Sequence, residues 1–482
     1  MSHRIYILSI VGFLCIAYSL TLLPPILVSI WFDDGELSDF IATFFLLLAV
    51  GTLFWIPFRK QTEELRRTDG FLIVAIFWML LSFISAIPFW TGWHLDFVDS
   101  LFEATSGFTT TGATVFTDLD VIPPSILYYR QQLQFFGGMG LIVLAIAILP
   151  MLGVGGSQLY RAETPGPMKD EKLAPRLAHT ARGLCLIYFT LTFCCALGYW
   201  LAGMQPLEAL EHSYSTVSTG GFSTHDESLG YFRNPYIYNL AIVFMLLGAI
   251  NFGIHFMALS NRRFSIYFRD TEVRTFLLIV GGCTLFYTLV LYFENIYASI
   301  GDAMQYSLFE VTSVITSTGF GISDFSVWPL FLPVLLIFIS FIGGCGGSTA
   351  GGIKVIRILT LFKQAANQIF MLVYPRAIRP VKIGKRVLDD RTIQAIWGFF
   401  AVYIVIYAIL TLAMVASGMD QVTAFSAVAA CINNLGPGLG DVRATFTSVD
   451  DSAKLVAIVA MLMGRLEIFT LLVILTPGYW RG

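Results

Sequence analysis

Four short clusters of hydroxyl and glycine residues recur along this chain at nearly equal intervals. They are TTTGA at 109–113, VSTGG at 217–221, TSTGF at 316–320 and NNLGP at 433–437. Hydroxyl and backbone carbonyl oxygens can replace the hydration shell of a monovalent cation. The aligned glycines, Gly112, Gly220, Gly319 and Gly436, are 108, 99 and 117 residues apart. One such cluster is typical of an ordinary loop, but four in register predict a fourfold internal repeat.

A short, semi-apolar segment precedes each cluster, and none is long enough to cross a membrane. We predict half-length helices at 98–108, 205–216, 301–315 and 420–432. A half-helix that returns as extended chain is a re-entrant loop, which is tolerated at membrane depth only where it lines a polar path. Four such loops around one axis would form a ring of carbonyls, with the negative ends of the helices directed at it.

An acidic residue stands nine positions before three of the four aligned glycines. The residues at this position are Glu103, Glu211, Glu310 and Ala427. Acid in the first turn of a helix is stabilised by the helix dipole. We therefore expect the three glutamates to anchor the short helices and not to act as catalytic acids.

The elements that must position these loops are long apolar segments. Of the 482 residues, 56% are hydrophobic and 13% are charged, against about 25% charged in soluble domains. This composition excludes a soluble enzyme and a disordered regulator, and the unbroken apolar runs exclude an outer-membrane barrel. A membrane span needs about 20 apolar residues. Ten segments satisfy this rule, at 5–30, 38–57, 70–91, 128–150, 181–202, 236–260, 273–295, 328–372, 392–417 and 453–475.

Basic residues are concentrated on one side of the predicted membrane. The N-terminus, the C-terminus and alternate loops hold 24 of the 29 Lys and Arg residues. The positive-inside rule makes this side cytoplasmic and places both termini there.

A glycine-rich stretch interrupts the eighth apolar segment. Residues 342–352 read IGGCGGSTAGG, and each glycine in a helix interior costs about 1 kcal/mol relative to alanine. We therefore expect this helix to be broken at membrane depth. A phosphate-binding loop is excluded because Ile353 separates Gly352 from Lys354 and no Ser or Thr follows the lysine.

Arg465 lies in the middle of the last apolar segment. A charge there costs roughly 2.5–3.5 kcal/mol on insertion scales and marks a functional candidate. Glu467, two residues later, would not share its helical face. Two interpretations remain: a positive charge that faces the pore and opposes cations, or a buried ion pair with a distant partner.

Other function classes have less support in the sequence. The six histidines show no metal-ligand spacing such as HExxH, and there is no G-x-S-x-G motif. The seven cysteines form no CxxC pair and are expected to be small packing residues. We therefore expect no enzyme activity. An ion-coupled secondary transporter with discontinuous helices is the main alternative, although the span interiors contain few charges.

At the motif level the chain resembles the Trk/Ktr/HKT superfamily of potassium transporters, and specifically its bacterial TrkH-type membrane subunits. The most specific pieces are STGGF at 218–222, STGFG at 317–321 and NNLGPG at 433–438. The resemblance implies an all-α integral membrane protein. Four M1–pore helix/filter loop–M2 repeats would surround a pore in pseudo-fourfold arrangement, with two extra N-terminal transmembrane helices.

The same resemblance implies domain boundaries and a potassium site. The two N-terminal helices would occupy 1–65 and the four repeats 66–160, 161–265, 266–380 and 381–482. The K⁺ selectivity filter would comprise Thr110, Thr111, Gly112, Ser218, Thr219, Gly220, Ser317, Thr318, Gly319, Asn434, Leu435 and Gly436. In related plant proteins a serine at the first filter glycine accompanies sodium transport, so Gly112 favours potassium.

The resemblance also implies a gate and partners. The gate would be an intramembrane loop below the filter with Arg465, and its glycines are Gly343, Gly344, Gly346, Gly347, Gly351 and Gly352. We expect a homodimer in the bacterial inner membrane, regulated by a cytosolic TrkA-type ring that carries the nucleotide-binding domains. This chain itself would bind K⁺ but no nucleotide and no nucleic acid. A proton- or sodium-coupled potassium symporter is the alternative mechanism.

Overall fold

The computed structural model describes residues 2–58, 67–143, 177–329, 331–376, 379–384, 386–477 and 479. Within them the fold is helical, apart from a small antiparallel hairpin of β1 (Lys382–Ile383) and β2 (Arg386–Val387). Two expected domain boundaries, at 65/66 and 160/161, lie outside the described residues. So do the basic loops 59–66 and 144–176, which contribute to the predicted charge bias.

Two N-terminal spans precede four similar units. The N-terminal helices are α1 (Ser2–Leu20), α2 (Leu23–Phe32) and α3 (Leu37–Trp55). The first unit holds α4 (Arg67–Ser85), α5 (Ile87–Thr91), α6 (Phe97–Phe108) and α7 (Pro124–Val143). The second holds α9 (Leu177–Leu201), α10 (Pro206–Val217), α11 (Pro235–Ala249) and α12 (Phe252–Ser260), and α13 (Ser265–Arg269) follows it. The third holds α14 (Thr271–Phe293), α15 (Ile300–Ile315), α16 (Leu332–Ser340) and α17 (Val355–Val373). The fourth holds α18 (Asp390–Ala416), α19 (Gln421–Ile432), α20 (Asp451–Arg465) and α21 (Phe469–Leu475).

Each short helix packs against long ones: α6 against α4 and α7, α10 against α9 and α7, α15 against α14 and α11, and α19 against α18 and α20. By length and composition, six helices among the described residues can cross a membrane, or eight if two bent pairs each count as one span. The bent pairs are α11 with α12, at 95°, and α20 with α21, at 109°. The architecture is the predicted all-α integral membrane fold, with four units of long helix, short helix and long helix.

Four of the ten apolar segments do not form one continuous span within the described residues. Segments 236–260 and 453–475 form the two bent pairs. Segment 128–150 begins inside α7, which carries Arg130 and several buried glutamines and is less apolar than a lipid-facing helix. Segment 328–372 is divided into α16 and α17 by the glycine-rich stretch, as predicted.

The short helices α6, α10, α15 and α19 contain 12 to 16 residues. At about 1.5 Å per residue they are shorter than the roughly 30 Å hydrocarbon core. Local capping starts them: the Ser299 hydroxyl accepts the N–H of Asp302 at 3.0 Å, and the Asp420 carboxylate accepts the N–H of Val422 at 2.9 Å. The half-length helices are thus confirmed, within one residue at each end.

The acids that face the helix dipole are not the predicted ones. The first turns of α6, α10 and α15 contain Asp99, Glu208 and Asp302. Glu103, Glu211 and Glu310 lie in the middle of these helices, where the dipole offers little stabilisation. The dipole explanation for these three glutamates is therefore wrong, and their contacts require another account.

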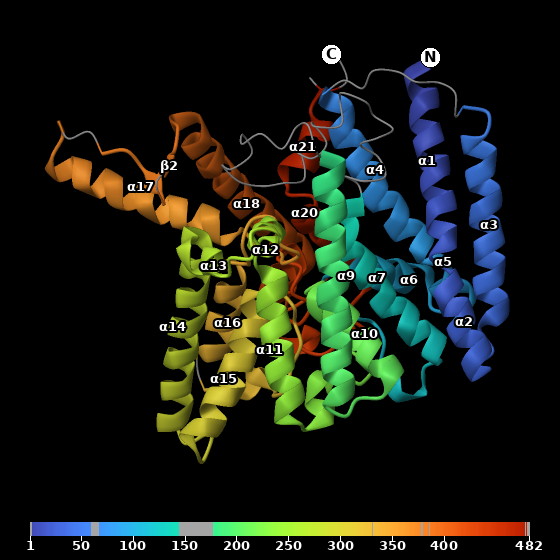
Figure 1. Cartoon of the computed structure of the whole chain (residues 1–482), viewed down its shortest axis with the longest axis horizontal. Helices are drawn as coiled ribbons and strands as arrows, with labels where there is room; N and C mark the ends of the chain where they lie inside the picture. Colours follow the sequence, from blue (N-terminus) through green and yellow to red (C-terminus); the bar gives the residue numbers. More distant parts are fainter. Residues whose placement is uncertain are drawn as a thin grey trace.

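The N-terminal spans pack closely at one edge of the molecule (Figure 1). A Cβ atom on Gly12 of α1 would lie 2.7 Å from the carbonyl oxygen of Gly51 on α3, so these helices touch backbone to backbone. At the opposite edge, α17 leaves the bundle and runs across the direction of the other helices (Figure 1). Its outer part exposes Phe362, Ile369 and Leu372.

Candidate functional site

All four short helices end in the same backbone turn. The bonds that define it are Thr111 N to Ser106 O, Gly220 N to Ser215 O and Thr318 N to Ser313 O, each 2.8 Å, and Leu435 N to Ala430 O, 2.7 Å. One position earlier, φ is 52–55° at Thr110, Thr219, Ser317 and Asn434. One position later, φ is 80–96° at Gly112, Gly221, Gly319 and Gly436. We call these four three-residue stretches, 110–112, 219–221, 317–319 and 434–436, the filter segments.

This register corrects the sequence alignment in the second repeat. Gly221, and not Gly220, has the left-handed conformation of Gly112 and Gly319. Gly220 occupies the position of Thr111 and Thr318. The alignment failed because two consecutive glycines fit the motif equally well. The shared Gly–Phe pair at 221–222 and 319–320 is a sequence signal that could have fixed the register.

The corrected register also changes which residue of the second unit lies nine positions before the left-handed glycine. His212, and not Glu211, is the structural counterpart of Glu103 and Glu310. The four units therefore carry two glutamates, one histidine and one alanine at this place, where the sequence alignment had three acids.

The four filter segments close into a ring. A Cβ atom on Gly112 would lie 2.2 Å from Gly220 O, on Gly221 1.9 Å from Thr318 O, on Gly319 2.0 Å from Leu435 O, and on Gly436 2.8 Å from Thr111 O. Each unit thus touches the next, and the fourth touches the first. Glycine is required at these positions both by φ and by space. We call this arrangement the filter ring.

Hydroxyl and amide groups surround the filter ring, and all are buried. The hydroxyls of Thr109 and Thr111 lie 2.7 Å apart, as do those of Thr316 and Thr318. Asn434 Nδ2 donates to the Thr111 hydroxyl at 2.9 Å, which links the fourth unit to the first. A cation at the ring would meet backbone and hydroxyl oxygens. Among the described residues, no group of three or more His, Cys, Asp and Glu side chains is placed to hold a metal ion.

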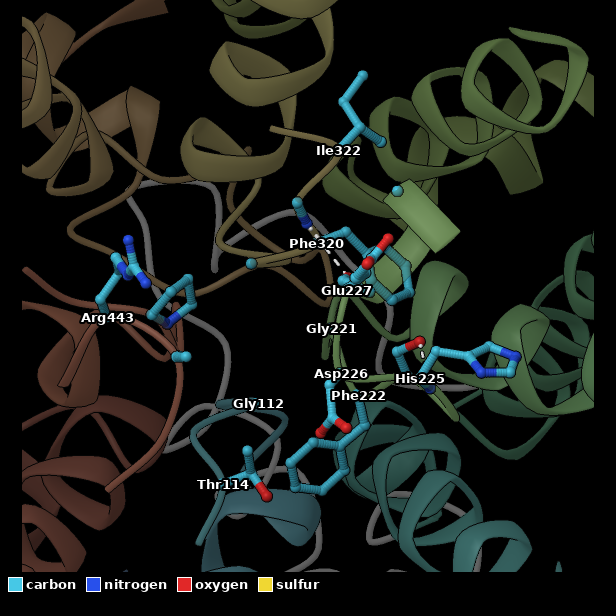
Figure 2. Close-up of a pocket in the computed structure, with 18 of the residues that line it drawn as sticks. Gly112, Thr114, Gly221, Phe222, His225, Asp226, Glu227, Phe320, Ile322 and Arg443 are labelled. Atoms are coloured by element: carbon cyan, nitrogen blue, oxygen red, sulfur yellow. Dashed lines mark hydrogen bonds between the residues drawn. The ribbon is translucent and has the colours of Figure 1, made fainter. Parts of the chain in front are cut away.

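A cavity of about 770 Å³ lies against the filter ring. It is lined by all four ring glycines and by the loops that follow them. In Figure 2 the labelled residues stand around an open centre, with Arg443 on the side opposite His225. Its charged lining residues are Arg130, Arg233, Arg443, Asp226, Glu227 and Asp324. The cavity therefore leads to the ring and is lined by charged as well as apolar side chains.

His225 connects the loops of the first and second units beside this cavity. Its Nδ1 lies 2.7 Å from the Asp120 carboxylate and its Nε2 3.2 Å from that of Glu208, and its ring stacks on Tyr231 at 3.5 Å. Partial burial opposes the charged form, but the hydrogen bonds to Glu208 and Asp120 outweigh it and raise the pKa of His225 above its ordinary value. No motif in the sequence marks this histidine as functional.

The glycine-rich stretch, which we call the intramembrane loop (341–354), is docked on the break between α11 and α12. Cys345 N donates to Ala249 O at 2.9 Å, and Phe252 N donates to Gly347 O at 3.1 Å. The glycines make this path possible, because φ is 70°, 75° and 76° at Gly343, Gly347 and Gly352. The predicted break is confirmed, and the break in α11 that receives it was not predicted.

The intramembrane loop also contacts the filter ring directly. Gly351 N donates to the Ser317 hydroxyl at 2.5 Å, and a Cβ atom on Gly351 would lie 2.0 Å from Asn433 O. The Thr349 hydroxyl lies 3.1 Å from Val217 O, at the end of α10. Loop and ring are therefore in van der Waals contact.

Glu272, at the start of α14, holds the loop from its other side. Its Oε1 accepts the N–H of Gly346 at 2.7 Å and that of Ile356 at 3.2 Å. One carboxylate oxygen thus joins the loop to the first turn of α17. The sequence carries no signal for this role of Glu272, which is an isolated acid at the start of an apolar segment.

Arg465 reaches the loop from the fourth unit. Its guanidinium donates to Thr349 O at 2.9 Å and to Gly137 O of α7 at 2.6 Å. It lies at the last residue of α20, where the chain bends, and not inside a continuous helix as predicted. Glu467 pairs with Arg357 at 2.8 Å. The arginine is therefore placed beside the predicted gate and bridges the loop to α7.

Known proteins resemble this chain along its whole length. A family model, TrkH, described as a cation transport protein, matches residues 36–478. The Trk system potassium uptake protein TrkH of Escherichia coli K12 is 50% identical over 99% of this chain and 100% of that protein. TrkG of the same organism is 42% identical over 100% and 99%. The crystal structure of the potassium transporter TrkH from Vibrio parahaemolyticus covers 100% of both chains, with 47% identity and a TM-score of 0.91.

Proposed function

The chain belongs to the TrkH family of cation transport proteins. From this premise we propose that it takes up potassium through a pore in which the filter ring selects the ion. The observation that carries the proposal is the closed contact of the four filter segments, in which each ring glycine abuts a carbonyl of the next unit. Four short helices end at this ring, so their negative ends favour a cation there. No catalytic activity is proposed for the chain.

We propose the intramembrane loop and Arg465 as the gate. The loop is docked under the ring through Gly351 and Ser317. Arg465 adds a positive charge beside it, which opposes a cation leaving the ring. Opening would then require the loop to release its contacts with Glu272 and Arg465.

We propose that the termini, and with them α17, lie on the cytoplasmic side of the inner membrane. The basic-residue bias supports this orientation, and α1 begins at the same end of the molecule at which α21 ends (Figure 1).

A homodimer is supported by the apolar side chains that α17 exposes outside the bundle. A cytosolic TrkA-type ring is the proposed regulator. The hairpin at 382–387 with its flanking basic residues, between Arg376 and Arg391, is its proposed contact surface.

Ion flux into proteoliposomes tests the proposal. Potassium, rubidium and sodium gradients would be applied in turn to the wild type, Gly112→Ser and Gly282→Ser. At Gly112 a Cβ atom would lie 2.2 Å from Gly220 O, whereas at Gly282, in α14, nothing lies within 4 Å. We expect potassium-selective flux in the wild type and in Gly282→Ser, and sodium admission in Gly112→Ser.

Other outcomes would redirect the proposal. Unselective flux in all three proteins would show that the ring does not select potassium over sodium. No flux without a proton or sodium gradient would favour a coupled symporter. A buried carboxyl group in a pore helix, such as that of Glu310, would give that mechanism an ionisable group.

A further inference from the structure

A buried side chain on each pore helix holds the chain that leaves the filter ring. In three units the residue three positions after the ring glycine donates its backbone N–H to such a side chain. These bonds are Val115 N to Glu103 Oε2 at 2.9 Å, Ile322 N to Glu310 Oε1 at 2.9 Å, and Leu439 N to Ser426 Oγ at 2.8 Å. In the second unit His212 Nε2 hydrogen-bonds the Ser223 hydroxyl at 3.0 Å. We call these four contacts the exit clasps.

The clasp of Glu103 is reinforced by a cation. Arg130 Nε donates to the Glu103 carboxylate at 2.7 Å, and both side chains are buried. The guanidinium also packs over Phe222 at 4.3 Å and hydrogen-bonds the Ser223 carbonyl at 3.3 Å. Arg130 thus joins the exit chain of the second unit to the clasp of the first.

The clasp of Glu310 has a different construction. Its Oε1 accepts the N–H groups of both Ile322 and Ser323, at 2.9 and 3.0 Å. The side chain is 1% exposed, and its Oε2 has no hydrogen-bond partner among the described residues. A single oxygen therefore fixes two successive amides of the exit chain, and no other side-chain acceptor serves them there.

The two carboxylate clasps lie across the ring from each other. The contacts of the filter ring run in the order of units one, two, three and four, so the first and third units are opposite. Glu103 and Glu310 hold this diagonal, whereas His212 and Ser426 hold the other. The position of each filter segment is thus fixed at its start by the helix end and at its exit by a clasp.

We propose that the exit-clasp side chains, among them Glu103, Glu310 and Ser426, are positioning residues that set the spacing of the filter oxygens and thereby the preference for potassium over sodium. Ion preference in a carbonyl cage depends on the number and placement of its oxygens. A buried N–H that loses its acceptor must move to find another, and the exit chain that carries it then shifts the filter segment. This inference rests on the proposed function, because it assumes that the ring selects the ion.

Glu211 provides a matched control. It is a buried carboxyl on a pore helix, adjacent in sequence to the clasp residue His212. No hydrogen bond joins it to the exit chain among the described residues, and its Oε1 has no partner there. Neutralising Glu211 therefore changes a buried carboxyl without changing a clasp.

The test compares potassium and sodium influx into proteoliposomes that contain the full-length wild type, Glu310→Ala, Glu310→Gln, Ser426→Ala or Glu211→Gln. We expect the potassium-to-sodium ratio to fall about tenfold in Glu310→Ala and about threefold in Ser426→Ala, because each exit amide loses its acceptor. Glu310→Gln keeps one acceptor oxygen and should be intermediate. Glu211→Gln should keep the wild-type ratio. Ser426→Ala removes one hydroxyl only, so it remains informative if Glu310→Ala does not fold.

The outcomes distinguish failure of this inference from failure of the proposed function. A wild type without potassium preference removes the proposed function itself. A selective wild type with an unchanged ratio in Glu310→Ala or Ser426→Ala, even at reduced total flux, assigns the clasps a structural role only and overturns the inference. An equal fall in Glu211→Gln also overturns it, because any buried carboxyl would then serve.

Discussion

The filter ring and the intramembrane loop are both glycine-rich backbone at membrane depth, but they are held in opposite ways. In the ring, four segments fill one another's space, and each glycine abuts a carbonyl of the next unit. The loop comes from the third unit alone and is held by separate hydrogen bonds from Glu272, Arg465 and α11. Under the proposed gate, we therefore expect the loop to move more easily than the ring.

The largest expected effect comes from a methyl group in the ring. Gly221→Ala would place a Cβ atom 1.9 Å from Thr318 O at a φ of +80°. The φ alone costs roughly 1–2 kcal/mol, about tenfold in an equilibrium, so selective potassium flux should fall by at least that factor. Gly220→Ala meets the Gln134 side chain instead and should be milder.

Gly282→Ala in α14 is the control for this pair, because nothing lies within 4 Å of its Cβ position. It should keep wild-type flux and gain up to about 1 kcal/mol of stability from helix propensity. If Gly220→Ala proves more damaging than Gly221→Ala, the register of the second unit is the one that the sequence alignment gave.

Arg465→Ala tests the role of the intramembrane loop and its neighbouring charge in the proposed gate. It removes the bonds to Thr349 O and Gly137 O together with the charge, and basal potassium flux should rise roughly tenfold as the electrostatic barrier is lost. Arg465→Lys keeps the charge but not the two-sided bond, so it should raise flux much less. Equal or lower flux in well-folded Arg465→Ala protein would contradict a barrier role.

A smaller increase is expected when Glu272 is replaced. Glu272→Ala removes the acceptor of the Gly346 and Ile356 amides. The net loss, about 0.5–1.5 kcal/mol for a hydrogen bond, should raise basal flux about threefold. Unlike a ring substitution, it should leave the potassium-to-sodium ratio unchanged. A changed ratio with constant flux would show that the loop is part of the filter.

The smallest effect is a pH dependence at the outer loops. The pKa of His225 in the folded protein lies above its ordinary value of 6.5. Its stabilisation, about 0.2–1 kcal/mol for such an ion pair, is therefore complete below pH 6.5 and disappears as pH rises through the folded-state pKa. The melting temperature of wild type minus that of His225→Gln should be largest in acid and vanish in alkali. A difference that grows with pH would refute this assignment.

Sequence patterns predicted the repeat, the half-length helices and the broken eighth segment, because each depends on composition over ten or more residues. They did not predict the register at Gly221, since a one-residue shift leaves the composition of the cluster unchanged. The Gly–Phe pair shared by 221–222 and 319–320 favours the second alignment, and the positive φ at Thr219 and Gly221 establishes it.

Contacts between distant residues were also beyond the sequence. Glu272 holds an amide 74 residues away, and Arg465 bonds a carbonyl 328 residues away. Arg465 could be singled out because a charge in an apolar segment is costly. Glu272 stands at the edge of its segment, where an acid is ordinary, so nothing in its local pattern marks it.

The closing contact of the filter ring joins the two most distant parts of the repeat, because Gly436 rests on Thr111. During synthesis from the N-terminus, a chain that ends before residue 434 has three filter segments and an open side. The ring is complete only when the fourth short helix has been inserted. Synthesis therefore completes the filter ring last, and chains interrupted before the fourth filter segment carry no closed ring, even when the first three segments are intact.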